Sequence, residues 1–175
     1  GNETFAANVA YETVLSTVAP VADPTREGYK FLGWYAQGTG VPFNGKMPAT
    51  DVVYEASFTA GDHTQYIIEI YMMDTDGQYS MSTTTVSHGV TGAIVTIVPS
   101  TATGFTFDAS LSELSKEIAA DGSTTLKIYY ARDLYTVTWD VDGLETEEEV
   151  YFGAAIVAPE DPAKDGYTFA GWDPA

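Results

Sequence analysis

Apolar and polar positions alternate along much of this 175-residue chain, and a period of two is typical of β-strands. The clearest case is "TQYIIEIYMM" at 64–73. A second is "STTLKIYYAR" at 123–132, where Leu126, Ile128 and Tyr130 share one face. Further strands are expected at 52–58, 92–98 and 135–139, the last with Tyr135, Val137 and Trp139 on one face. The pattern predicts a mostly β protein.

Two segments depart from simple alternation. The run "GAIVTIV" at 92–98 is apolar throughout, which favours a buried central strand. The stretch "SLSELSKEIAA" at 110–120 places Leu111, Leu114 and Ile118 at helical spacing, although it is short and rich in serine. With this one helical candidate, the fold class is mostly β, and α+β at most.

One motif occurs twice. "DPTREGYKFLGW" at 23–34 returns as "DPAKDGYTFAGW" at 161–172, with seven of twelve positions identical at an offset of 138. The first copy contributes Asp23, Pro24, Gly28, Tyr29, Phe31, Gly33 and Trp34, and the second Asp161, Pro162, Gly166, Tyr167, Phe169, Gly171 and Trp172. A match of this quality indicates a genuine internal repeat.

The motif predicts a turn followed by a strand. A residue before proline favours extended backbone, so Asp23 and Asp161 are expected to end a segment. Gly28 and Gly166 then supply the left-handed position that stops the turn.

In the strand that follows, alternation places Tyr29, Phe31 and Gly33 on one face and Leu32 and Trp34 on the other. The second copy is expected to repeat this arrangement. Glycine beside tryptophan suggests an indole lying over a neighbouring backbone. The rings are either the core of a small domain or a platform on which sugars stack. Because one face must point inward, we interpret them as core.

No third copy lies between the two motifs, and the middle of the chain has a different pattern. We therefore expect three parts: 1–60, 61–132 and 133–175. The first lacks a counterpart of "YTVTW", its expected first strand, and the last stops before a counterpart of "MPATDVVYEASF", so it is truncated at its C-terminal end. The sequence carries no signal peptide and reads as a fragment of a longer protein that continues both ways.

Composition narrows the functional classes. The chain has 25 acidic and 7 basic residues, a net charge of −18 and no cysteine. This acid excess argues against a nucleic-acid partner and against docking on anionic lipid. No apolar run reaches about 18 residues, so no membrane insertion is expected. Disulfides and thiol chemistry are excluded.

Catalytic signatures are missing. His63 and His88 are the only imidazoles, and each lies beside turn-forming residues. No nucleophile elbow, zinc-protease motif or phosphate-binding loop is present. We expect neither an enzyme nor a cofactor.

Calcium is a weaker alternative. "DTDG" at 74–77 and "DVDG" at 140–143 imitate the start of an EF-hand loop, which makes Asp74, Asp76, Asp140 and Asp142 candidate ligands. Both stretches follow strands, where Asp-Gly normally forms a hairpin turn. We interpret them as turns. The acidic run Glu145, Glu147, Glu148 and Glu149 reads as a solvated strand edge.

The motif also carries a resemblance to a known family. "VAP…DPTREGYKFLGWY", the later "MPATDVVYEASF" and the "YTVTW" that opens the second copy resemble the Listeria–Bacteroides repeat, also called the internalin B-repeat. The resemblance covers 1–60 and 133–175 and implies small β-grasp-like units, in tandem, in extracellular bacterial surface proteins. Within residues 61–132, the stretches "IYMMDTDGQYS", "GVTGAIVTIVPSTATGFTFD" and "IAADGSTTLKIYYAR" are similar to mucin-binding-protein repeats. The resemblance implies no catalytic residue.

The sequence therefore predicts a structural spacer or stalk of a secreted or surface-attached bacterial protein, with its small units in an elongated arrangement. Its neighbours would be the flanking repeats of the parent chain. The alternative is an adhesin that binds a glycan, a mucin or a protein ligand.

Overall fold

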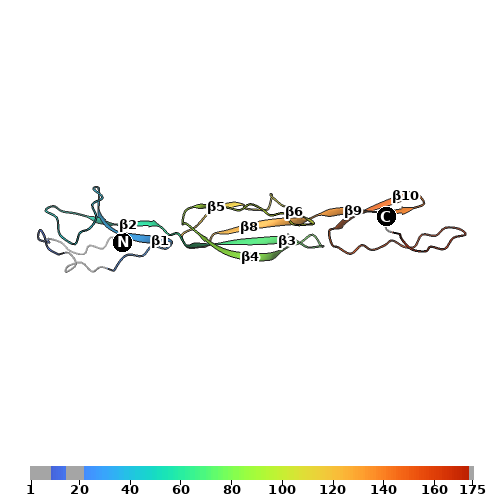
Figure 1. Cartoon of the computed structure of the whole chain (residues 1–175), viewed down its shortest axis with the longest axis horizontal. Coiled ribbons are helices and arrows are strands. Elements are labelled where there is room, and N and C mark those ends of the chain that lie inside the picture. The colour runs from blue at the N-terminus through green and yellow to red at the C-terminus, as the bar shows by residue number, and fades with distance from the viewer. Residues whose placement is uncertain (1–8, 15–21, 174–175) are drawn as a thin grey trace. The chain divides into compact units, whose positions relative to one another are not determined.

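The computed structural model describes residues 9–14 and 22–173, and every regular element in these ranges is a β-strand (Figure 1). The strands are β1 (Tyr29–Ala36), β2 (Tyr54–Ala60), β3 (Thr64–Met73), β4 (Tyr79–Gly89), β5 (Ile94–Thr96), β6 (Phe105–Phe107), β7 (Ser115–Glu117), β8 (Thr125–Arg132), β9 (Leu134–Val141) and β10 (Leu144–Tyr151). The mostly β prediction is confirmed.

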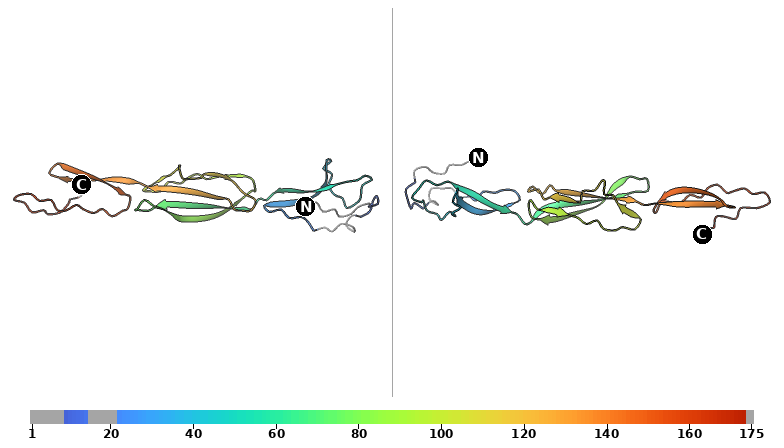
Figure 2. Two further views of the ribbon diagram at one scale, coloured as in Figure 1. Left: turned by 180° about the vertical axis from the view of Figure 1, so that it is seen from behind. Right: turned by 90° about the horizontal axis from the view of Figure 1, so that it is seen from above.

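The strands form several small sheets. β1 pairs with β2, β9 with β10, and β5 with β7, while a four-stranded sheet has the order β4-β3-β8-β6. Figure 2 shows β3 and β4 side by side from behind and from above. The finer β-grasp arrangement stays a prediction.

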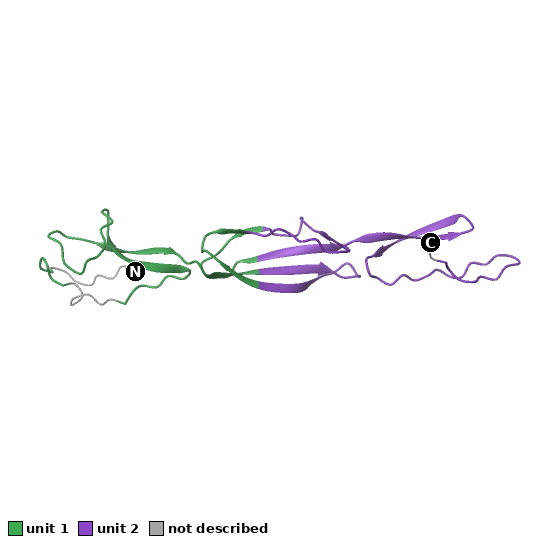
Figure 3. Ribbon diagram, in the orientation of Figure 1, with its two compact units in different colours: residues 1–67, 86–95, 115–125 green, residues 68–85, 96–114, 126–175 purple. Residues whose placement is uncertain are grey.

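By its internal contacts the chain forms two compact units, coloured separately in Figure 3. Unit 1 comprises Gly1–Ile67, Val86–Val95 and Ser115–Thr125, and unit 2 comprises Ile68–Thr85, Thr96–Leu114 and Leu126–Ala175. The boundary falls within β3, β4, β5 and β8. The division into 1–60, 61–132 and 133–175 stays a prediction.

The most deeply buried side chains come from the middle of the sequence. In unit 2, Leu126, Ile128 and Tyr130 are only 0%, 2% and 4% exposed, and they alternate along β8 as predicted. In unit 1, Ile118 is 3% exposed. Strict alternation on a half-buried strand gave the right face, because each residue turns its side chain to the opposite side from the last.

The strand after the first motif contains a bulge that the sequence did not reveal. The pairing of β1 with β2 shifts between Phe31 and Gly33, so Leu32 has no paired position and is 55% exposed. An extra residue reverses the side on which later side chains lie. Phe31 and Trp34 consequently meet edge to face, 5.8 Å apart. The prediction that they lie on opposite faces is wrong.

Gly33 lies at this bulge and has a positive φ. Its φ of 136° lies where side-chain-bearing residues are strained. Apart from its two chain neighbours, a Cβ there would meet only the Tyr35 ring, at 3.6 Å. At Gly171, with φ 129°, nothing in the described structure other than its chain neighbours lies within 4 Å of a Cβ. The indole expected over a neighbouring backbone stays a prediction.

The helix expected at 110–120 does not form. The Asp108 carboxylate accepts hydrogen bonds from the backbone N–H groups of Ser110 and Leu111, which fixes a turn. Further on, Ser115–Glu117 is β7, and the N–H of Ile118 donates to Ala93, 2.9 Å away. Serine and aspartate bind nearby backbone groups and so compete with a helix.

The apolar run at 92–98 is not a buried central strand. Only Ile94–Thr96 is a strand, and it pairs with β7 alone. Ile94 is 71% and Val98 86% exposed. Apolar composition without alternation did not identify the buried side, and the interior of the larger sheet is taken by β3 and β8.

The second motif copy forms its turn but no strand at 167–172. In the first copy, β1 is held by the backbone ladder to β2. Among the described residues, 167–172 pair with no strand, so their backbone groups join no ladder.

Candidate functional site

The two motif copies make the same turn. The N–H of Tyr29 donates to the carbonyl of Arg26 at 3.0 Å, and that of Tyr167 donates to Lys164 at 3.1 Å. Gly28 and Gly166 are left-handed, with φ of 73° and 80°, as predicted. A cation lies over each tyrosine ring, with the Arg26 guanidinium at 3.9 Å and the Lys164 ammonium at 4.9 Å.

Before each turn lies irregular backbone. The carboxylates of Asp23 and Asp161 are exposed there, and the rings of Pro24 and Pro162 are half-buried.

The motif's other aromatic rings pack against one another. In unit 1, Phe31 contacts both Trp34 and Phe58 edge to face, at 5.8 and 5.6 Å. In unit 2, Trp172 contacts Phe169 at 5.4 Å and Trp139 at 4.9 Å, also edge to face. The rings of Phe31, Trp34, Phe169 and Trp172 are half-buried rather than presented as a flat platform. This packing supports the core interpretation.

Within unit 1, the glycine of the first motif is locked to residues of the middle of the chain. We call the contacts of Gly28 with Gly61, Thr64, Thr91 and Ala120 the Gly28 joint. The Gly28 carbonyl accepts two hydrogen bonds, each 2.7 Å long, from the N–H of Gly61 and the hydroxyl of Thr91. The N–H of Thr91 in turn donates to the Gly61 carbonyl at 2.9 Å.

Two buried threonines complete the Gly28 joint. Thr64 and Thr91 are 8% and 5% exposed, and their hydroxyl oxygens are 2.6 Å apart. Because the hydroxyl hydrogen of Thr91 goes to Gly28, Thr64 must be the donor to Thr91. A Cβ on Gly28 would lie 2.6–2.8 Å from Ala120 atoms, so only glycine permits this approach.

A second joint, the Arg132 joint, lies within unit 2 and comprises Met73, Gly104, Arg132, Asp133 and Phe152. The Arg132 guanidinium donates to the carbonyls of Met73 at 3.0 Å and Phe152 at 2.6 Å. The N–H of Phe152 donates to Asp133, and that of Asp133 to Gly104. A Cβ on Gly104 would overlap the Phe152 ring. One side chain thus ties the end of β3 to the residue after β10.

The calcium candidates take part in turns. Asp74 accepts hydrogen bonds from the N–H groups of Asp76 and Gln78 between β3 and β4. Asp140 accepts from the N–H of Gly143, and Asp142 pairs with Lys164 at 2.6 Å. Asp142 and Gly143 have φ of 53° and 85° and join β9 to β10 as a two-residue hairpin turn. Within residues 9–14 and 22–173, no three metal-binding side chains come together.

The acidic run faces solvent along β10, where Glu145, Glu147, Glu148 and Glu149 are all exposed. Glu148 accepts a hydrogen bond from the Trp139 indole at 3.0 Å. The other three lie on the opposite face of the β9–β10 ribbon.

The two histidines meet in unit 1. The rings of His63 and His88 stack 4.1 Å apart and 3° from parallel, and both are exposed. Beside them, Lys30 pairs with Asp62 at 2.6 Å, and the hydrogen bond from Lys30 lowers the pKa of the Asp62 carboxyl. Both partners of this pair are more than half exposed, so it adds little stability.

In unit 2, three tyrosines form a half-buried cluster. The rings of Tyr71 and Tyr129 stack 4.6 Å apart, and Tyr79 meets Tyr129 edge to face at 5.2 Å. Burial, followed by the hydrogen bond to Asp108, raises the pKa of Tyr79 to about 12. Hydrogen bonds from Ser110 and then Tyr79 lower the pKa of Asp108. We call Tyr71, Tyr79 and Tyr129 the tyrosine cluster.

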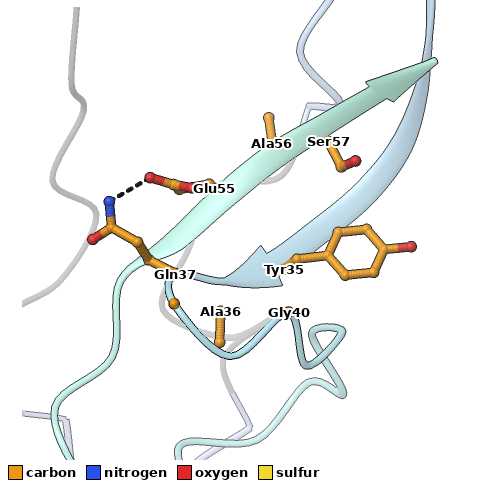
Figure 4. Close-up of a pocket in the computed structure, with 8 residues that line it drawn as sticks. Tyr35, Ala36, Gln37, Gly40, Glu55, Ala56 and Ser57 are labelled. Atoms are coloured by element: carbon orange, nitrogen blue, oxygen red, sulfur yellow. Dashed lines mark hydrogen bonds between the residues drawn. The ribbon is translucent and has the colours of Figure 1, made fainter.

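The two hollows described next are open to solvent. One, of about 400 Å³, lies at the end of the β1–β2 pair and is lined by Tyr35, Gln37, Glu55 and Ser57 among others. Figure 4 shows Gln37 bonded to Glu55, with the Tyr35 ring extending away from that pair. The lining of this first hollow contains neither histidine nor cysteine. A second, of about 370 Å³, adjoins the Gly28 joint.

Within residues 9–14 and 22–173, no helix is long and apolar enough to span a bilayer. The structure thus shows small β-sheets, two tight joints and a motif that contributes rings to packing. These features define a repeat-type β protein.

The Listeria-Bacteroides repeat domain family matches residues 1–60 and 135–174, and the chain belongs to this family. Internalin H of Listeria monocytogenes serovar 1/2a is 32% identical over 123 residues, which is 65% of this chain. The chain spans 22% of the length of that relative. No solved structure matches. Residues 61–134 lie outside the family match, and their resemblance to mucin-binding-protein repeats stays a prediction.

Sequence reasoning identified Gly28 but missed its partners. Gly61, Thr91 and Ala120 belong to no motif, and Thr91 lies 63 residues from Gly28. Arg132 was missed as well. The sequence offered one signal for Arg132. It is one of 7 basic residues in a chain with 25 acidic residues, and it lies at the end of an apolar strand.

Proposed function

We propose that this segment is a non-enzymatic spacer in the repeat region of a secreted or surface-attached bacterial protein. The Gly28 joint is the observation behind the proposal. At this joint Gly28, a motif residue where any side chain would clash, contacts the part of the chain that follows the motif. A motif used for docking neighbours together suits a structural role.

The connection at this joint leaves little slack. β2 ends at Ala60 and β3 begins at Thr64, so only three residues join them. The first of these three residues is Gly61, whose N–H and carbonyl are both bonded within the joint. Buried hydrogen bonds at a short connection resist hinge motion, which is what a spacer requires.

The location outside the cell belongs to the proposal. The family resemblance implies it, and the likeness to part of Internalin H is compatible with it.

Small-angle X-ray scattering of the 175-residue chain tests the spacer role. A compact globule of this length has a radius of gyration of about 16 Å. We expect a clearly larger value, with a distance distribution that has a long tail, because each unit of a spacer touches mainly its neighbours.

Charge repulsion alone expands a flexible chain, so the measurement needs a control at high salt. Screening at about 1 M NaCl reduces the Debye length to about 3 Å. A spacer keeps its dimensions there. A radius that falls to about 16 Å would contradict the proposal.

The tyrosine cluster favours a second candidate, an adhesin for glycans or mucin. Tyr130 is buried at 4% exposure, but the three cluster rings are not. Glu69 bonds the Tyr71 hydroxyl and Asp108 the Tyr79 hydroxyl, so aromatic faces and polar acceptors lie together. Such surfaces suit sugars, which present both apolar faces and hydroxyls.

Binding of the chain to a mucin and glycan array tests this candidate. Tyr129→Ala is the informative variant, and Tyr11→Ala is its matched control because Tyr11 is 65% exposed and outside the cluster. Saturable binding lost only in Tyr129→Ala would establish the adhesin. Absence of binding to every mucin and glycan on the array would contradict the adhesin candidate.

A further inference from the structure

The two copies of the motif have nearly the same turn in different surroundings. In unit 1 the glycine of the turn is enclosed, since a Cβ on Gly28 would collide with Ala120 at 2.6 Å. In unit 2, nothing lies within 4 Å of a Cβ on Gly166 in the described structure. Tyr167 is 74% exposed, whereas its counterpart Tyr29 is half-buried beside Gly61 and Ala120.

Open space does not require glycine. At Gly166 the positive φ of 80° does require it, and the same conformation is what turns the Gly28 carbonyl towards Gly61 and Thr91. Gly166 therefore holds its carbonyl in the geometry that binds two donors in the first copy.

We propose that the turn at 164–167 is a docking surface for a unit built like residues 61–132. The partner would present a backbone N–H in the place of Gly61, a threonine hydroxyl in the place of Thr91 and a close backbone in the place of Ala120. This proposal rests on the spacer function, because it makes the Gly28 joint the repeating connection of the array.

A second copy of this chain is a poor occupant. In each chain, the matching surface formed by Gly61, Thr91 and Ala120 is already covered by its own Gly28. Docking between two copies would require that joint to open. A further middle unit in the same polypeptide has no such competitor.

The proposed contact differs from the Gly28 joint in one charge. Lys30, which pairs with Asp62, is replaced by Thr168 in the second copy. Because the Lys30–Asp62 pair is exposed, its loss changes the docking little.

An extended chain tests the proposal: residues 1–172 followed directly by a copy of residues 35–132, since Trp172 aligns with Trp34. Hydroxyl-radical footprinting then reports the accessibility of Tyr167 in the 175-residue and extended chains. We expect labelling of Tyr167 to fall several-fold in the extended chain, to the level of Tyr29 in the same molecule.

Two variants of the extended chain separate docking from simple proximity. Replacing the appended copy of Thr91 by valine removes the hydroxyl that would bond the Gly166 carbonyl, and it should restore the labelling of Tyr167. The native Thr91 is untouched, so Tyr29 should stay protected. Gly166→Ala should restore labelling in the same way.

The proposal fails if Tyr167 stays as reactive in the extended chain as in the 175-residue chain while Tyr29 is protected. It also fails if Tyr167 becomes protected in the 175-residue chain as concentration rises, because a second copy would then be the occupant. Scattering tests the spacer function independently, so a compact radius with a protected Tyr167 would reject the function and keep the docking surface.

Discussion

At the scale of single residues, the two motif glycines can be compared within one molecule. Gly28 and Gly166 share a left-handed φ, but only Gly28 has a close neighbour. Gly166→Ala should cost about 1–2 kcal/mol from backbone strain. Gly28→Ala should cost an additional ~1–3 kcal/mol from overpacking against Ala120. Urea unfolding of both variants gives the comparison, and equal losses would contradict the geometry of the Gly28 joint.

The hydroxyl of Thr91 carries the polar side of the same joint. Thr91→Val keeps the shape but leaves the Gly28 carbonyl and the Thr64 hydroxyl short of a partner in a buried place. The expected loss is about 1–3 kcal/mol in the free energy of unfolding. Thr83→Val, at an exposed position of β4, is the matched control and should change stability by less than about 0.5 kcal/mol.

Tyr79 should make the folded state sensitive to alkaline pH. Its pKa is raised from 10.0 to about 12, so the folded state holds the proton more tightly than the unfolded state. The stability from this group is complete below pH 10 and is lost as the pH rises towards 12. Tyr79→Phe removes the group that titrates.

The measurement is the difference in unfolding free energy between the wild type and Tyr79→Phe, followed from neutral to alkaline pH. We expect the wild type to lose more stability than the variant above pH 10. Parallel pH profiles would show that Tyr79 is as accessible to solvent when folded as when unfolded.

At the scale of elements, alternation succeeded where a strand is long and one-sided. β3 spans 64–73 as predicted, and the buried face of β8 is the one that alternation indicated. The two predictions that rested on other patterns failed. The apolar run that contains β5 does not alternate, and at 110–120 the side chains of Asp108 and Thr124 bind the backbone instead of allowing a helix. Helical spacing of a few leucines did not outweigh this local competition.

The bulge in β1 leads to a test at the element scale. Phe31 packs on Trp34 and Phe58, while Leu32 is unpaired and exposed. Phe31→Ala should cost about 2–4 kcal/mol and Leu32→Ala less than about 0.5 kcal/mol. Thermal unfolding distinguishes them. Comparable losses would mean that the strand alternates without a bulge and that Leu32 faces the core.

At the scale of the whole chain, the repeat is visible in the sequence, but the contacts between the repeat motif and the middle of the chain are not. The identity of Gly28 is visible in both copies, whereas its partners Gly61 and Thr91 are brought to it only by folding. A single sequence contains no pattern that links residues so far apart without a motif of their own. The open second copy became informative only once the enclosed first copy was known.

The net charge of −18 makes a prediction for the molecule as a whole. Like charges destabilise a compact state, and salt screens them. Raising NaCl from about 0.01 M to about 1 M shortens the Debye length from about 30 Å to about 3 Å, so the melting temperature should rise. Each kcal/mol gained corresponds to about 2–4 °C for a chain of this size.

The acidic face of β10 provides the control for this effect. Glu145, Glu147 and Glu149 lie on one side of the strand, and Glu145 is directly opposite Asp140. Glu147→Gln removes one charge from the middle of the row, so it should raise the melting temperature at low salt and lose that advantage at high salt. If the gain persists at about 1 M NaCl, it does not come from charge, because exposed charges more than about 3 Å apart are screened there. Local strand propensity would then explain it.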